Sequence, residues 1–263
     1  MLSLEYLLEE AKNNGLPILK KRAVLREYLQ VIILNSIYKQ KLGRMLFFTG
    51  GTALRFFYHM PRFSEDLDFD TQELDFVGFR QMISLAQKGL HKEGFSPEIS
   101  CSKRKNLFTA ELYFKDLMKL YNIVDRRGID LMLKIEVYRP SWKVAIESSV
   151  LSLYGYNFSA ILLSKGSMIS EKLLALLSRK RGRDIYDILF MLKKKFAFAR
   201  EPLLAHKIIA EPRQLLLKFL KKLPERELKS LANQVKPFLF KEEDIELILS
   251  APLYAEKFLK DCE

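Results

Sequence analysis

The chain has 263 residues, 49% of them hydrophobic, and a formal net charge of +12. This length suits one large domain or two modest ones, and the composition excludes a disordered chain. Two cysteines are too few for a disulfide scaffold, the N-terminus lacks the basic start of a signal peptide, and no apolar run reaches the roughly 18 residues that cross a bilayer. We therefore expect a cytoplasmic protein without a membrane partner. The positive charge favours nucleic acid as a partner, although an ordinary basic surface would give the same excess.

The first part of the chain predicts helices alternating with strands. Apolar residues recur every three or four positions where we expect helices, and Gly43 and Pro61 end two of these stretches. The predicted helices cover residues 16–42, 52–59 and 76–91, and the predicted strands cover residues 45–49 and 63–70.

The middle of the chain is rich in β-branched and aromatic residues, and the remainder is helical. Strands are expected over residues 108–114, 128–138 and 158–163, and helices over residues 170–178, 183–195, 213–222, 225–234 and 242–249. The change near residue 165 predicts a catalytic domain over residues 1–165 and a helical domain over residues 166–263. The expected fold class is α/β (α+β): a small mixed sheet with flanking helices, followed by an α-helical C-terminal domain.

Two neighbouring segments carry the clearest chemical signal. Gly50 and Gly51 follow an apolar strand and open a helix, so their backbone N–H groups could bind phosphate. The Thr52 hydroxyl could bond a phosphate oxygen or cap the helix. In the following strand, Asp66 and Asp68 are two residues apart and share a face.

Two adjacent carboxylates repel each other unless a cation lies between them. Oxygen ligands without a nearby histidine favour Mg²⁺, with Mn²⁺ as the alternative. Arg62 and Ser64 share the face of Asp66, whereas we expect Asp70 to be an exposed strand end. A phosphate cradle facing a carboxylate pair outlines a nucleotidyl-transfer site.

The ordered motifs of this chain resemble the nucleotidyltransferase toxins of the AbiEii/AbiGii type, which belong to the polymerase-β-like nucleotidyltransferase superfamily. The resemblance rests on Gly-Gly-Thr-Ala-Leu and on Arg-x-Ser-x-Asp-x-Asp-Phe, and it continues at Lys134-Ile-Glu136-Val137, residues 171–176 and residues 183–187. These motifs span residues 45–190, and roughly the last seventy residues show no motif of the family.

The resemblance implies that Asp66 and Asp68 bind two metal ions and that a third acid comes from a neighbouring strand. Glu136 is the candidate, with Asp130 as the alternative. Because a buried unpaired acid is costly, Glu136 needs a cation nearby, and Lys134 on the same strand face could provide it. The alternative interpretation is a Lys134–Glu136 pair on an exposed strand face.

In the helical part, the resemblance implies that Lys172 contacts the triphosphate of the NTP substrate. Asp184 could hold Lys172 or Arg183 in place or contact substrate, and together with Arg183 it is assigned to the site. The other interpretation of Asp184 is an acid that complements a helix dipole.

The function implied is metal-dependent transfer of a nucleoside monophosphate from an NTP to an acceptor, with release of pyrophosphate. The family further implies the toxin of a toxin–antitoxin or phage-defence pair, with RNA, at the tRNA 3′ end, as acceptor and a cognate antitoxin as partner. Two alternatives stay open: transfer to a small molecule or a protein side chain, and an inert nucleic-acid-binding protein.

Overall fold

The computed structural model describes residues 1–123 and 130–261. It divides into two compact units: the first comprises Met1–Tyr58, Phe63–Pro140 and Glu147–Leu162, and the second comprises His59–Arg62, Ser141–Ile146 and Leu163–Glu263. The second unit therefore takes two short segments from the part of the chain before residue 165. The fold is mixed α/β, as predicted.

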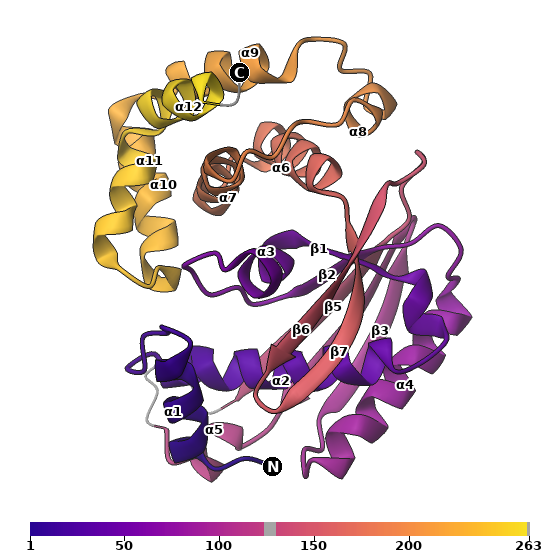
Figure 1. Ribbon diagram of the computed structural model, residues 1–263. Helices are drawn as coiled ribbons and strands as arrows, with labels where there is room; N and C mark the ends of the chain where they lie inside the picture. The colour runs from indigo at the N-terminus through magenta and orange to yellow at the C-terminus, as the bar shows by residue number, and fades with distance from the viewer. Residues whose placement is uncertain (124–129, 262–263) are drawn as a thin grey trace. The chain divides into compact units, whose positions relative to one another are not determined.

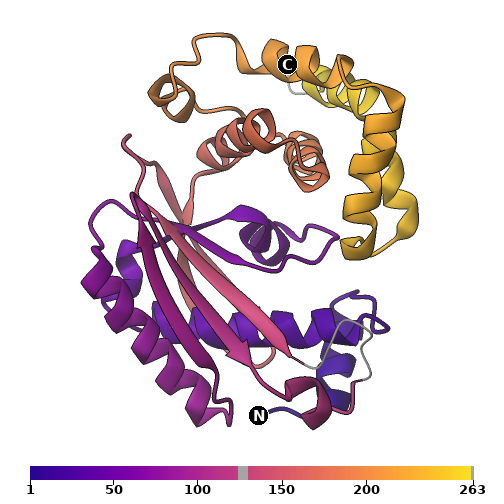
Figure 2. The ribbon, with the colours of Figure 1, turned by 180° about the vertical axis from the view of Figure 1, so that it is seen from behind.

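A seven-stranded mixed sheet forms the centre of the first unit (Figures 1 and 2). Its order is β3 (Glu98–Arg104), β4 (Leu107–Phe114), β5 (Leu131–Tyr138), β2 (Leu67–Asp70), β1 (Phe47–Thr49), β7 (Tyr156–Leu163) and β6 (Ile146–Leu153). The central strand β2 is antiparallel to β1 and parallel to β5. Strands that are distant in sequence thus become neighbours at the centre of the sheet.

Alternation of apolar and polar residues decides which face each β5 side chain occupies. Leu133, Ile135 and Val137 are fully buried in the core, while Lys134 and Glu136 alternate with them and are half-buried. The predicted strand over residues 128–138 begins partly outside the described residues.

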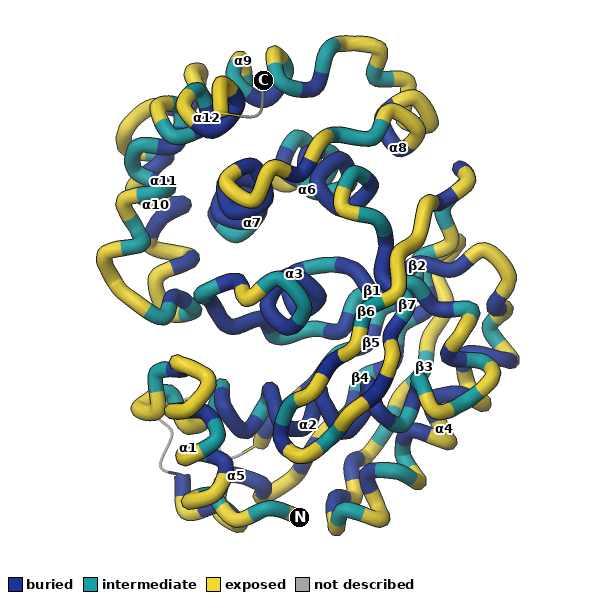
Figure 3. Tube along the Cα trace, viewed as in Figure 1, coloured by how far each residue is buried: buried dark blue, intermediate teal, exposed yellow. Residues whose placement is uncertain are grey.

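The helices of the first unit are α1 (Leu4–Asn13), α2 (Lys21–Tyr38), α3 (Gly50–Tyr58), α4 (Phe76–Lys92) and α5 (Leu117–Leu120), with a 3-10 turn η1 (Leu42–Met45). The longest two, α2 and α4, pack side by side against the sheet (Figures 1 and 2). Helix α3 packs on β1 and β2, and most of it is buried (Figure 3). The turn before α3 is thereby fixed to the central strands.

The described part of the second unit is helical apart from two strand ends. Its helices are α6 (Lys165–Arg179), α7 (Gly182–Lys193), α8 (Glu201–Ala205), α9 (Pro212–Lys221), α10 (Glu225–Val235), η2 (Lys236–Phe238), η3 (Glu242–Ile245), α11 (Glu246–Leu249) and α12 (Ala251–Lys260). Helix α7 is its central helix, packed against α6, α10 and α12. A Cβ on Gly182 would lie 2.0 Å from the carbonyl oxygen of Leu231, so glycine allows α7 and α10 to approach closely.

Several predicted boundaries were wrong for identifiable reasons. Strand β2 begins at Leu67 and not at residue 63, and α6 begins at Lys165 because the Ser164 hydroxyl caps it by accepting from the Ser167 N–H. Helix α12 was missed because Pro252 suggested a break, although proline is tolerated in the first turn of a helix.

Candidate active site

The glycine turn at the start of α3 lies against the carboxylate of Asp68. Gly50 has a φ of +76°, which L-residues with a side chain rarely adopt. A Cβ at this position would lie 2.2 Å from Oδ2 of Asp68. Gly50 is therefore required twice, for its backbone conformation and for the close approach of the carboxylate.

Thr52 ties the same turn to Asp66. Its hydroxyl donates a 2.5 Å hydrogen bond to the backbone carbonyl of Asp66, and its side chain is buried. The hydroxyl predicted for phosphate or for a helix cap thus holds the chain just before β2. Asp66 precedes the strand, while Asp68 lies within it.

Asp68 and Glu136 are paired in the register of the parallel strands β2 and β5. Nζ of Lys134 on β5 lies 2.7 Å from Oε1 of Glu136. Partial burial lowers the pKa of Lys134, but Glu136, Asp66 and Asp68 outweigh this effect and raise the pKa above its ordinary value. The ammonium of Lys134 therefore experiences the field of all three predicted carboxylates.

The three carboxylates have the donor chemistry of a hard-cation site, and the Lys134 ammonium is the positive charge among them. Across residues 1–123 and 130–261, however, no group of three or more His, Cys, Asp or Glu side chains is arranged to hold a metal ion. The three carboxylates fit a divalent cation by charge and ligand type.

Of three other acidic or polar candidates, Asp70 differs from the prediction. Asp130, the alternative third acid, lies directly before β5, and its carboxylate accepts a hydrogen bond from the backbone N–H of Asp116. Asp130 is six residues before Glu136, the residue paired with Asp68 in the strand register. Asp70, expected to be exposed, is 3% exposed. Ser64 is buried, and its carbonyl accepts from the Gln30 amide.

The predicted residues of the second unit form a chain of ion pairs. Nζ of Lys172 lies 2.9 Å from Oδ2 of Asp187 and 3.4 Å from Oδ1 of Asp184. Arg179 donates two 2.8 Å hydrogen bonds to Asp184, and Arg62 donates two, of 2.8 and 2.7 Å, to Asp187. Both aspartates are almost fully buried, so they need these cations.

The electrostatics of this ion-pair chain favour the charged forms. Burial lowers the pKa of Lys172, but Asp187 and Asp184 raise it to a net value above the ordinary one. Burial raises the pKa of Asp184, but Arg179 and Lys172 lower it to a net value below the ordinary one. Lys172 keeps 15% side-chain exposure and carries a full positive charge at neutral pH.

Arg62 differs from its predicted placement. Arg62 was expected on the strand face of Asp66, but it is 2% exposed and bonded to Asp187 within the second unit. Its bridge to Leu239 further holds it there. The guanidinium of Arg183 lies 4.8 Å from the ring centre of Phe238.

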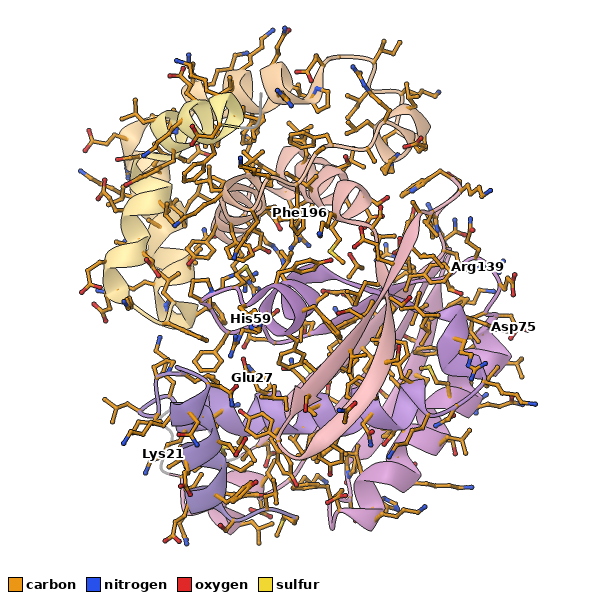
Figure 4. All side chains as sticks on the ribbon, viewed as in Figure 1. Lys21, Glu27, His59, Asp75, Arg139 and Phe196 are labelled. Atoms are coloured by element: carbon orange, nitrogen blue, oxygen red, sulfur yellow. The ribbon has the colours of Figure 1, made fainter. Side chains whose placement is uncertain are left out.

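The sequence analysis missed one buried ion pair behind the glycine turn. Glu27 of α2, labelled in Figure 4, accepts a 2.8 Å hydrogen bond from Arg55 of α3, and both are buried. Burial raises the pKa of Glu27, and Arg55 opposes this shift. A glutamate directly before the apolar stretch from Tyr28 to Tyr38 was the available signal that a buried partner exists.

The first unit defines a nucleotidyltransferase-like protein: a mixed sheet with a glycine turn beside a strand aspartate and a glutamate on the parallel neighbour. The family model described as "Nucleotidyl transferase AbiEii toxin, Type IV TA system" matches residues 32–255. The chain belongs to this family, as its motifs predicted, and is a nucleotidyltransferase.

Solved structures show the same fold at low sequence identity. The chain is similar to JHP933 from Helicobacter pylori, with 19% identity, a TM-score of 0.60 and coverage of 92% of this chain and 93% of that one. A putative nucleotidyltransferase from H. pylori has 18% identity, a TM-score of 0.59 and coverage of 92% and 96%. The nucleotidyltransferase toxin MenT4 from Mycobacterium tuberculosis H37Rv has 16% identity, a TM-score of 0.57 and coverage of 100% and 91%. No curated protein shows a significant match.

Proposed function

We propose that this nucleotidyltransferase transfers a nucleoside monophosphate from an NTP to a hydroxyl of an RNA acceptor in a metal-dependent reaction. The acceptor oxygen forms a bond to the α-phosphorus, the bond from the α-phosphorus to the β-phosphate oxygen breaks, and pyrophosphate leaves. The family describes toxins of type IV toxin–antitoxin systems, which implies a cognate antitoxin and an NTP substrate. The tRNA 3′ end is our candidate acceptor within RNA.

The observation that carries the proposal is the set of acids around Lys134. Asp68 lies against the glycine turn and is paired in register with Glu136, and Glu136, Asp66 and Asp68 all raise the pKa of Lys134. Bound Mg²⁺ or Mn²⁺ would neutralise phosphate charge and lower the pKa of the acceptor hydroxyl. Asp66 and Asp68 would hold the metal, and Glu136 would accept the proton of the hydroxyl.

Backbone groups and lysines supply the positive side of the proposed reaction. The first N–H groups of α3, beginning at Gly50 and Gly51, have no partners within the helix and suit an anion. Lys172 would bind the triphosphate, and its ion pairs with Asp184 and Asp187 would fix its position.

RNA is favoured as acceptor by the net charge of +12, because neutralising phosphates releases counterions from nucleic acid. A small-molecule or protein acceptor would not need this charge. Among the described residues, no helix is both long and apolar enough to span a bilayer.

The test is incubation of the protein with labelled NTPs, Mg²⁺ and total cellular RNA. We expect label in RNA, loss of labelling with a chelator and loss of labelling in Asp68→Ala. Asp130→Ala removes an exposed acid outside the site and is the matched control, which should retain labelling. Label in protein or in a small molecule would refute the RNA acceptor, and full activity of Asp68→Ala would refute the site.

A further inference from the structure

A cleft in the second unit lies among the α7–α8 loop, α9 and α12. It has a volume of about 760 Å³ and adjoins a smaller hollow of about 220 Å³ that shares its walls. The loop that forms one wall begins at Phe196, which follows α7 and is labelled in Figure 4. None of the lining residues belongs to the motifs that carry the proposed chemistry.

Cations and an aromatic ring line the cleft together. Arg200 comes from the loop, Arg213 from α9 and Lys260 from α12, while Phe198 is a half-buried ring between the two hollows. Arginine and lysine side chains neutralise phosphates, and an exposed aromatic face stacks on nucleobases. This is the combination that binds single-stranded nucleic acid.

Acids in the cleft are mostly engaged by other groups. Oε2 of Glu211 accepts the N–H of Gln214 and caps α9, and Glu256 forms an ion pair with Lys221. Asp261 is the remaining acid of the smaller hollow. The two hollows together are lined by four lysines and arginines and three acids, so the positive charges exceed the negative charges by one.

The surrounding segment is strongly basic. Residues 193–222 contain nine lysines and arginines against two glutamates, a net charge of +7 out of +12 for the whole chain. Lys193, Lys194 and Lys195 at the end of α7 are all exposed. Three of these nine cations, Lys195, Arg200 and Arg213, line the two hollows.

We propose that this cleft binds a single-stranded stretch of the acceptor RNA. Its volume lies in the range that takes a small ligand, which suits one or two nucleotides. The inference rests on the proposed function, because it assigns the acceptor of the same transfer reaction to a surface of the second unit.

The experiment measures binding of a short labelled single-stranded oligoribonucleotide to the full chain by fluorescence anisotropy. We expect Phe198→Ala and Arg213→Glu each to weaken binding by about tenfold or more. Arg213→Gln should also lower the salt dependence, by about 0.7 in the slope of log affinity against log salt. Arg200→Glu, in an exposed loop, tests the cleft without disturbing a helix.

Lys222→Glu is the matched control for Arg213→Glu. Lys222 is an exposed residue at the end of α9, the helix that carries Arg213, and it does not line the cleft. Lys222→Glu should weaken binding clearly less than Arg213→Glu. In the transfer reaction, the cleft variants should raise the KM for RNA and leave the KM for NTP unchanged.

Two failures are distinguishable. If the wild-type chain binds RNA and Lys222→Glu weakens binding as much as Arg213→Glu and Arg200→Glu do, RNA binds to basic residues outside the cleft as strongly as to those inside it, and the cleft assignment is wrong. If the wild-type chain neither binds nor labels RNA, the RNA acceptor itself is wrong.

Discussion

Replacing Gly50 with alanine perturbs the candidate active site at one defined contact. The new methyl group would lie 2.2 Å from Oδ2 of Asp68 and 2.8 Å from its Cβ and Cγ. These distances are far below a normal contact, so the Asp68 side chain must move. The φ of +76° adds backbone strain.

Gly155 provides a control with the same backbone conformation. Its φ is also +76°, but a Cβ there would meet nothing within 4 Å. The left-handed conformation costs about 1–2 kcal/mol for a residue with a side chain. Both alanine variants pay this cost, and only Gly50→Ala also displaces a carboxylate.

The assays are urea denaturation and NMP transfer. We expect Gly155→Ala to lose about 1–2 kcal/mol of unfolding free energy with its transfer activity intact. Gly50→Ala should lose more stability and also lose transfer activity, because Asp68 no longer occupies its position beside the turn.

A double variant separates the contact from the backbone strain. Combining Gly50→Ala with Asp68→Ala removes the contacts with Oδ2 and Cγ and leaves only the 2.8 Å contact with Cβ, so the combined stability loss should be smaller than the sum of the two single losses. Equal stability loss in Gly50→Ala and Gly155→Ala, with full activity in both, would refute the close approach of Asp68 to the turn.

Three further predictions concern the charged groups. Asp187→Ala should lower the free energy of unfolding in urea by about 3–5 kcal/mol, and by more than Arg62→Ala does, because the buried Asp187 neutralises both Arg62 and Lys172. An equal or smaller loss of unfolding free energy for Asp187→Ala would contradict this ranking. The pKa of Asp184 lies below the ordinary 3.8, so the ionised carboxylate stabilises the fold above pH 3.8, and this stabilisation declines as the pH falls through the lower pKa of the folded protein. Asp184→Asn should therefore flatten the loss of melting temperature in acid. An unchanged acid profile would show that the ion pairs of Asp184 contribute nothing to stability. Lys134→Ala removes the ammonium that Glu136, Asp66 and Asp68 stabilise, so adding Mg²⁺ or Mn²⁺ should raise the melting temperature of this variant more than that of the wild type. Equal shifts in melting temperature would argue against a cation site at these acids.

Local patterns in the sequence determined much of the fold. Helix α4 was predicted from residue 76 and is observed from Phe76, and β4 and α10 lie within a residue of their predicted bounds. These elements have regular apolar periodicity or clear ends. The family, too, follows from short motifs, because the chemistry of phosphate and metal binding requires particular residues at close spacing.

The sequence also predicted which side chains of β5 share a face. Alternation placed Lys134 and Glu136 on one face, and the structure contains that pair. Its closeness to Asp68 depends on the register of β2 with β5, which are separated by more than sixty residues along the chain. Local periodicity does not encode such a pairing.

Only the tertiary structure decided what the other charged residues contact. Arg62 is next to the Asp66 motif in sequence, yet it bonds Asp187, 125 residues away, because the segment His59–Arg62 belongs to the second unit. Sequence identifies the charges in a chain, but a buried charge is neutralised by whichever partner packing brings within reach. That choice depends on the whole fold, so neighbours in sequence did not predict it.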